Sequence, residues 1–149
     1  MKHSHERINM ILIEDEIKKV KVFRKALTNL EQFHSIRVFK GANTCMMHLN
    51  NRKTEVPHLL FFEVNRNSYA WIADIKAIRK DSKYNNLSIA IYDSNASITE
   101  EESFVAGANI YIRKKKDSDE LKRILKKVLI IDWQYFSGKF KRDTYMLSI

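Results

Sequence analysis

Proline and glycine are scarce in this sequence. The 149 residues include one proline, Pro57, and three glycines. This scarcity leaves little room for long flexible linkers or low-complexity tracts, and no internal repeat is visible. Because 44% of the residues are hydrophobic, the chain can still bury an ordinary core, and its length predicts a single domain.

Cysteine and long apolar runs are also lacking. The one cysteine, Cys45, cannot close an internal disulfide, which fits a reducing compartment. No run approaches the roughly 18 apolar residues that are needed to cross a bilayer. The first residues are followed by too short an apolar stretch for a signal peptide. We therefore expect a cytoplasmic protein that does not act at a membrane.

Acidic residues are outnumbered by basic ones. There are 18 acids against 27 lysines and arginines, so the formal net charge is +9. Such an excess of positive charge can bind nucleic acid, an anionic membrane surface or an acidic partner. Lysine dominates, and the chain has neither an RNA-binding aromatic motif nor a helix-turn-helix pattern. We therefore expect a solvated basic helix face and a basic tail, with nucleic-acid binding as an alternative.

The central feature of the sequence is a short apolar run that ends in an acid. Residues 59–62 are large and apolar, and Glu63 follows them. A run that is apolar on both alternating faces predicts a strand covered by helices on both sides. In open α/β sheets, ligands bind at the carboxyl ends of the strands. Glu63 is therefore expected at a functional edge.

Strand and helix patterns alternate along the chain. Strands are predicted at residues 8–13, 35–39, 59–65, 87–92 and 108–113. Helices are predicted over residues 16–30, 42–51, 70–80 and 99–106, and a last helix follows a cap at Asp117 or Ser118. This alternation predicts an α/β fold: a flavodoxin-like, doubly wound, five-stranded parallel sheet in the order 2-1-3-4-5, with helices on both faces.

That strand order brings charged side chains to one edge of the sheet. The acids follow the first, third and fourth strands and a lysine follows the fifth: Glu14, Asp15, Glu63, Asp93 and Lys114. The first and third strands are neighbours at the point where the strand order reverses. The sequence therefore predicts an acidic pocket that contains all four carboxylates.

Three stretches of the chain resemble the receiver domain of bacterial two-component response regulators. Residues 14–16, EDE, match the acidic cluster that follows the first strand of that family. Residues 57–65, PHLLFFEVN, resemble its pattern Pro-Asp-Leu-Ile-Phe-Leu-Asp-Leu-Asn. Residues 107–115, GANIYIRKK, match its pattern Gly-Ala-Asn-x-Tyr-x-x-Lys-Pro except for the proline. The resemblance runs from Ile8 to about Trp133.

The resemblance implies roles for the residues of the pocket. The phosphorylated aspartate of the family falls on Glu63, and the lysine that holds the phosphoryl group falls on Lys114. The switch positions fall on Asp93, where the family has Thr or Ser, and on Tyr111. A divalent cation, Mg²⁺ in this reading, would be held by Glu14, Asp15 and the backbone carbonyl of Asn65.

Two departures from the family pattern argue against phosphorylation. Glu63 is longer than aspartate by one bond of roughly 1.5 Å, and a misplacement of about 1 Å can cost on the order of a hundredfold in rate. Asp93 places an anion against the phosphoryl group, a repulsion of roughly 4 kcal/mol at about 4 Å and an effective dielectric of about 20. We expect a stand-alone signalling module that is not an enzyme. A phosphotransfer-competent receiver that uses Glu63 is the alternative.

Four carboxylates and one ammonium leave an excess of negative charge in the predicted pocket. Three outcomes would relieve it: a carboxylate takes up a proton, Asp93 pairs with Lys114, or a hard divalent cation binds. We rank the Asp93–Lys114 pair first. A simpler arrangement, in which Glu63 pairs with Lys114 and fills the pocket, also stays open.

The division of the chain and its partners follow from the same resemblance. Residues 1–133 are expected to form the receiver-like domain, and residues 134–149 an extension without a domain of its own. The extension is apolar enough to dock on its own domain or on a second copy, so a homodimer remains open. The expected partner is a histidine kinase or a downstream regulator, bound through the face of helix 4, strand 5 and helix 5.

Overall fold

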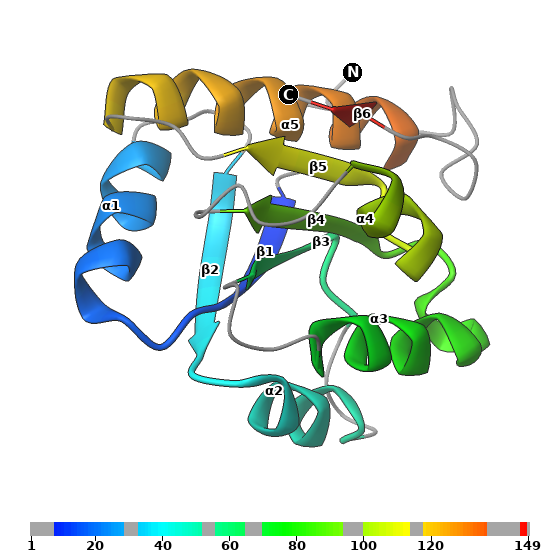
Figure 1. Ribbon diagram of the computed structural model, residues 1–149. Coiled ribbons are helices and arrows are strands. Elements are labelled where there is room, and N and C mark those ends of the chain that lie inside the picture. Colours follow the sequence, from blue (N-terminus) through cyan, green and yellow to red (C-terminus); the bar gives the residue numbers. More distant parts are fainter. Residues whose placement is uncertain are drawn as a thin grey trace.

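The computed structural model describes residues 8–28, 33–51, 56–64, 70–93, 100–113, 118–136 and 147–148. Strands and helices alternate along the chain as predicted (Figure 1). The strands are β1 (Ile8–Ile13), β2 (Phe33–Phe39), β3 (Leu59–Val64), β4 (Ser88–Asp93), β5 (Ile110–Arg113) and β6 (Leu147–Ser148). The helices are α1 (Ile17–Leu27), α2 (Ala42–Leu49), α3 (Ala70–Lys80), the 3-10 helix η2 (Ser82–Tyr84), α4 (Glu100–Ala106) and α5 (Ser118–Phe136).

Over the described ranges the sheet is six-stranded, all its strand pairs are parallel, and its order is β2-β1-β3-β4-β5-β6. The predicted order 2-1-3-4-5 is therefore confirmed. The short strand β6 is an addition that the sequence did not predict. It lies beside β5, with Leu147 opposite Ile110 and Ser148 opposite Tyr111.

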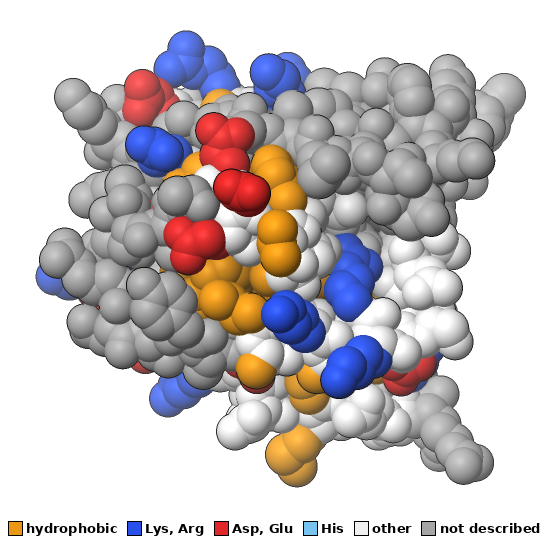
Figure 2. Space-filling model, turned by 45° about the vertical axis from the view of Figure 1, so that its right-hand side comes forward, with side chains coloured by type: hydrophobic (Ala, Val, Ile, Leu, Met, Phe, Trp, Pro, Cys, Tyr) orange, Lys and Arg blue, Asp and Glu red, His pale blue; other side chains and the backbone are white. Residues whose placement is uncertain are grey.

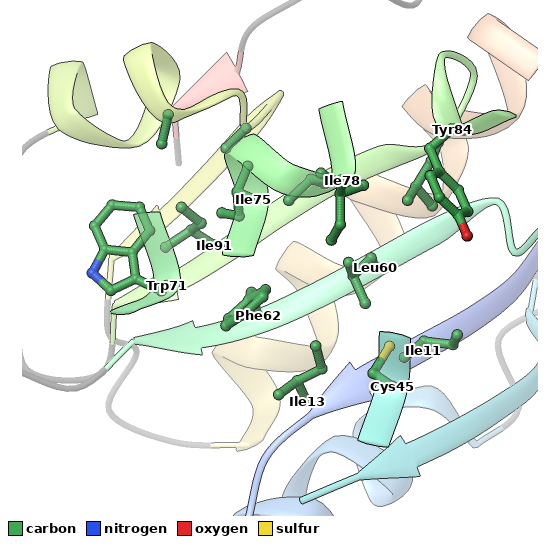
Figure 3. Packing of buried hydrophobic residues seen from close by; sticks show 14 of the residues in the cluster. Ile11, Ile13, Cys45, Leu60, Phe62, Trp71, Ile75, Ile78, Tyr84 and Ile91 are labelled. Atoms are coloured by element: carbon green, nitrogen blue, oxygen red, sulfur yellow. The ribbon is translucent and has the colours of Figure 1, made fainter. Parts of the chain in front are cut away.

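Helices cover both faces of the sheet, as Figure 1 shows. The core cluster on one face combines side chains of α1 and α5 with alternate residues of the strands. Within it, Phe23 contacts the rings of Phe61 and Tyr92 edge-to-face at 5.5 and 5.4 Å between centroids. The cluster on the other face joins α2, α3 and α4 to the sheet (Figure 3). Leu60 and Phe62 point into that second cluster, so β3 is buried on both sides as predicted.

The end of α4 is fixed by a glycine and by an arginine of α3. Gly107 has a φ of 123°, and a Cβ atom at this position would lie 2.8 Å from Cγ of Arg79. Arg79 donates hydrogen bonds to the carbonyl oxygens of Gly107, Tyr84 and Leu87 and to Oδ1 of Asn109. Gly107 therefore ends the helix as the sequence predicted, and Arg79 ties α3 to the segments on both sides of β4.

The buried side chains of α3 and α5 follow helical spacing, and those of α1 begin only after its first turn. Trp71, Ile75 and Ile78 of α3 are all buried. On α1, Phe23 is buried, whereas Ile17 is 71% exposed; six residues apart, the two side chains lie on different sides of the helix. Ile17 is the first residue of the helix, so it precedes the turns that pack on the sheet.

The longest described helix, α5, alternates apolar and basic side chains. Its buried residues are Leu121, Leu125, Val128 and Leu129, and its exposed ones include Lys122, Arg123, Lys126 and Lys127. The expected basic helix face is therefore present on α5. Neither α5 nor any other described helix is long and apolar enough to cross a membrane.

Candidate functional site

The carboxyl ends of β1, β3 and β4 bring three acids to the same edge of the sheet. Glu14 follows β1, Glu63 is the penultimate residue of β3, and Asp93 is the last residue of β4. The register aligns these ends, because Ile13 lies opposite Phe62 and Asp93 lies opposite Val64. These three acids therefore follow or end neighbouring strands at the carboxyl edge of the sheet.

Glu63 forms an ion pair with a lysine that the sequence analysis did not single out. Nζ of Lys19 lies 2.6 Å from Oε1 of Glu63. The Glu63 side chain is 6% exposed and that of Lys19 is 36% exposed. The same ammonium lies 3.4 Å from Oε2 of Glu16. Lys19 therefore links the first turn of α1 to the end of β3 and neutralises the carboxylate at the expected phosphoacceptor position.

Asp93 is wholly buried and accepts a hydrogen bond from a tyrosine. The hydroxyl of Tyr111 donates to Oδ2 of Asp93 at 2.8 Å, and Asp93 is 0% exposed. Burial raises the pKa of Tyr111 to about 12, with further contributions from the hydrogen bond and the charge of Asp93, while Arg113 acts in the opposite direction. At neutral pH the hydroxyl therefore keeps its proton and remains a donor to Asp93. The two expected switch positions are bonded to each other.

The two acids that follow β1 face different surroundings. Glu14 is buried, and its Oε2 accepts a hydrogen bond from the backbone N–H of Glu16 at 2.9 Å, at the start of α1. A carboxylate at a helix N-terminus is stabilised by the helix dipole. Oε1 of Glu14 is buried and has no hydrogen-bond partner within the described part of the chain. Asp15, by contrast, is exposed.

The described residues do not fit a divalent metal site. Hard cations such as Mg²⁺ need several converging oxygen ligands, and the described ranges contain no group of three or more His, Cys, Asp or Glu side chains that could hold a metal ion. Glu14 and Asp15, two of the expected ligands, differ in burial, and the third, Asn65, lies outside the described residues. The ammonium of Lys19 is already bound to Glu63.

The expected pairs with Lys114 stay predictions, because Lys114 also lies outside the described residues. What the structure adds is a cation from α1 for Glu63 and a neutral donor for Asp93. One signal for Lys19 was present in the sequence. It precedes the buried Phe23 by four residues, and residues at i and i+4 lie on the same face of a helix, so Lys19 shares the side of α1 that faces the sheet.

No family model and no curated protein sequence matches the chain. Solved structures match it in fold. The phosphorylated cyanobacterial phytochrome response regulator RcpA is 18% identical, with a TM-score of 0.70 over 91% of this chain and 97% of that one. Response regulator RPA3017 in red light signaling of R. palustris is 10% identical, with a TM-score of 0.72 over 90% and 96% of the two chains.

A chemotaxis protein gives the same result. Chemotaxis response regulator CheY4 of Vibrio cholerae is 16% identical, with a TM-score of 0.65 over 82% of this chain and 98% of that one. The match therefore spans nearly the whole of each solved domain, and at these identities the likeness is one of fold. Together with the strand order and the acids at the strand ends, it shows that this protein has the fold of response regulator receiver domains.

Proposed function

We propose that this protein is a stand-alone receiver-like module of a two-component phosphorelay that acts by contact with a partner protein and without phosphorylation of its own. The observation that carries the proposal is the buried hydrogen bond between Tyr111 and Asp93. It joins a carboxylate at the end of β4, the strand beside β3 and Glu63, to the middle of β5.

The position of Asp93 opposes phosphorylation at Glu63. Glu63 lies on β3 opposite Tyr92, the residue before Asp93. A phosphoryl group on Glu63 would bring negative oxygens toward the buried carboxylate of Asp93. The receiver family that the sequence resembles has a neutral Thr or Ser hydroxyl at this position. Solvent screens two negative groups at a buried edge much less than it screens charges in open water. The ion pair with Lys19 also engages Oε1 of Glu63, one of the two oxygens of the carboxylate that would have to act as the nucleophile.

The hydrogen bond from Tyr111 also favours a single conformation of β5. Turning the tyrosine outward would leave the carboxylate of Asp93 buried without this donor, which costs about 1–3 kcal/mol or more. Tyr111 is 1% exposed in the observed arrangement. A module held in this way presents the same surface to its partner at all times.

The partner surface that we propose is the face of α4, β5 and α5. The exposed residues of α4 are acidic in its first turn, at Glu100, Glu101 and Glu102, and Val105 is 71% exposed. Figure 2 shows acidic and apolar side chains side by side on this part of the surface. The bases of this face come from α5 and its acids from α4. A histidine kinase or downstream regulator that binds here would need both signs of charge.

Intact mass spectrometry after incubation with acetyl phosphate and Mg²⁺ tests the proposal. We expect no mass gain in the wild type, and a larger gain in the double variant Glu63→Asp with Asp93→Thr than in Glu63→Asp alone. The matched control for the wild type is Glu63→Gln, which removes the acceptor. A Mg²⁺-dependent gain in the wild type that disappears in Glu63→Gln would establish the alternative, a phosphotransfer-competent receiver.

A further inference from the structure

The outward surfaces of α3 and α4 form a face that carries both signs of charge. The two helices lie side by side on the sheet. On α4, Glu101 and Val105 are exposed and lie one turn apart on the same side of the helix. On α3, Lys76 and Lys80 are exposed and have the same spacing. We call these four residues, together with Ile72 of α3, the α3–α4 face.

Apolar side chains of the α3–α4 face adjoin the boundary between the two helices. Arg79 donates a hydrogen bond to the carbonyl oxygen of Gly107 at the end of α4, so this side of α3 faces α4. Ile72 lies two turns before Arg79 on the same side and is partly buried against the core. Val105 of α4 is 71% exposed. Figure 2 shows apolar side chains between basic and acidic ones on this side of the molecule.

The charges of the α3–α4 face are not paired within the chain. Among the described residues, neither Lys76 nor Lys80 forms an ion pair with Glu101, although their helices are neighbours. The hydrogen bonds from Arg79 to Gly107 and Asn109 hold α3 against the segment that follows α4. The face therefore presents charges of both signs on a rigid support, which lowers the cost of ordering it on binding.

We propose that the α3–α4 face binds a second copy of this chain in a twofold dimer. In such a dimer a surface patch meets the same patch of the other copy. With Val105 near the axis, the acid of each copy lies against the lysines of the other. Both contacts are attractive, so the face is complementary to itself in charge, and the exposed apolar side chain is removed from water.

Charge also selects this face over the others. The net charge of +9 on each copy opposes association, and the exposed lysines of α1 and α5 would repel each other there. With three glutamates in its first turn, α4 lets opposite charges meet. The two helices have 11 and 7 residues, which span about 17 and 11 Å. An interface of this size is small, so we expect a weak and reversible dimer.

Sedimentation velocity over a series of protein concentrations, up to about 1 mM, tests the proposal. The variants are Glu101→Lys and Lys76→Glu, each of which reverses one charge of the face. The matched controls are Asp119→Lys and Lys126→Glu on α5, which change the net charge by the same amounts on the opposite layer. All four positions are exposed, so the substitutions leave the core intact.

We expect the wild type and both controls to dimerise reversibly at high concentration. Glu101→Lys and Lys76→Glu should each associate at least about tenfold more weakly, because two like-charge contacts replace two attractive ones. An equimolar mixture of these two variants should recover the dimer, since each contact of the mixed dimer again joins opposite charges. The double variant should also recover it, at the net charge of the wild type.

Three results would overturn the proposal. The first is a wild type that stays monomeric throughout, which would leave the face to a different protein. The second is a dimer that both variants retain, which would place the contact between copies elsewhere on the chain. The third is a mixture that stays monomeric like its components. The proposal goes beyond the proposed function and is separate from it, because a mass gain with acetyl phosphate does not depend on self-association.

Discussion

The carboxylates of Glu63 and Asp93 at the strand ends bind different kinds of partner. Glu63 is neutralised by the ammonium of Lys19, whereas Asp93 accepts a hydrogen bond from the neutral hydroxyl of Tyr111. Each arrangement lowers the cost of a charge in a dry place, by Coulomb attraction in one case and by hydrogen bonding in the other. Together they lower the cost of two of the carboxylates that the sequence predicts at this edge.

Removing the tyrosine hydroxyl should weaken the fold. Tyr111→Phe keeps the ring in the core but takes away the donor to Asp93, so we expect a loss of about 1–3 kcal/mol in the free energy of unfolding. Urea denaturation measures this loss. Adding Asp93→Asn to Tyr111→Phe removes the buried charge and should recover part of the stability. Equal stability of the wild type and Tyr111→Phe would show that the hydrogen bond contributes nothing.

The same hydroxyl should give the wild type an alkaline weakness. The pKa of Tyr111 rises from 10.0 to about 12 in the folded protein, so the folded state holds its proton more tightly than the unfolded state does. The resulting stability is complete below pH 10 and is lost as the pH rises toward 12. The difference in stability between the wild type and Tyr111→Phe should therefore shrink over this range, which melting curves at a series of pH values can measure.

The sequence predicted the positions of the site residues better than their contacts. Glu14, Glu63 and Asp93 could be placed because each follows a strand whose apolar run is plain. Asp93 and Tyr111 were both named as switch positions, but their hydrogen bond depends on the register of β4 and β5, which aligns Ile91 with Tyr111 and is not visible in one sequence.

At the scale of elements, the five predicted strands are present with ends that differ by two residues or fewer, whereas the short strand β6 was not predicted. The predicted bounds of the third helix coincide with α3, and those of the first strand with β1. The second strand begins at Phe33, two residues earlier than predicted, and α5 continues past Trp133 to Phe136. Strand β6 has two residues, too few for any alternation to be read. Its position depends on pairing with the edge of β5, which is a tertiary contact and not a local sequence pattern.

The pairing of β6 with β5 gives a test of the predicted extension. Deleting residues 147–149 removes two backbone pairs from the edge of β5 and should lower the melting temperature by a few degrees and speed hydrogen exchange of the β5 amides. Ser148→Ala is the control, since it leaves the backbone pairs intact and should behave as the wild type. If the deletion melts and exchanges like the wild type, β6 contributes nothing to the stability of the sheet.

At the scale of the whole molecule, the first turn of α4 is an acidic patch on a mainly basic surface. α1 and α5 expose Lys18, Lys21, Lys122 and Lys126, and α3 exposes Lys76 and Lys80, whereas α4 exposes three glutamates in its first turn. The net charge of +9 is therefore not spread evenly over the described surface. The fold itself was predictable because the apolar periodicity agrees with the strand order throughout.

The central claim is that the site keeps one conformation in the presence and absence of phosphate or a metal ion, because Lys19 and Tyr111 already bind its carboxylates. Amide NMR spectra of the wild type, recorded with and without Mg²⁺ and beryllofluoride, a mimic of the phosphoryl group, test this claim most directly. We predict spectra that superimpose, including the amides of Glu63, Asp93 and Tyr111. Saturable shifts of these amides that disappear in Glu63→Gln would contradict it.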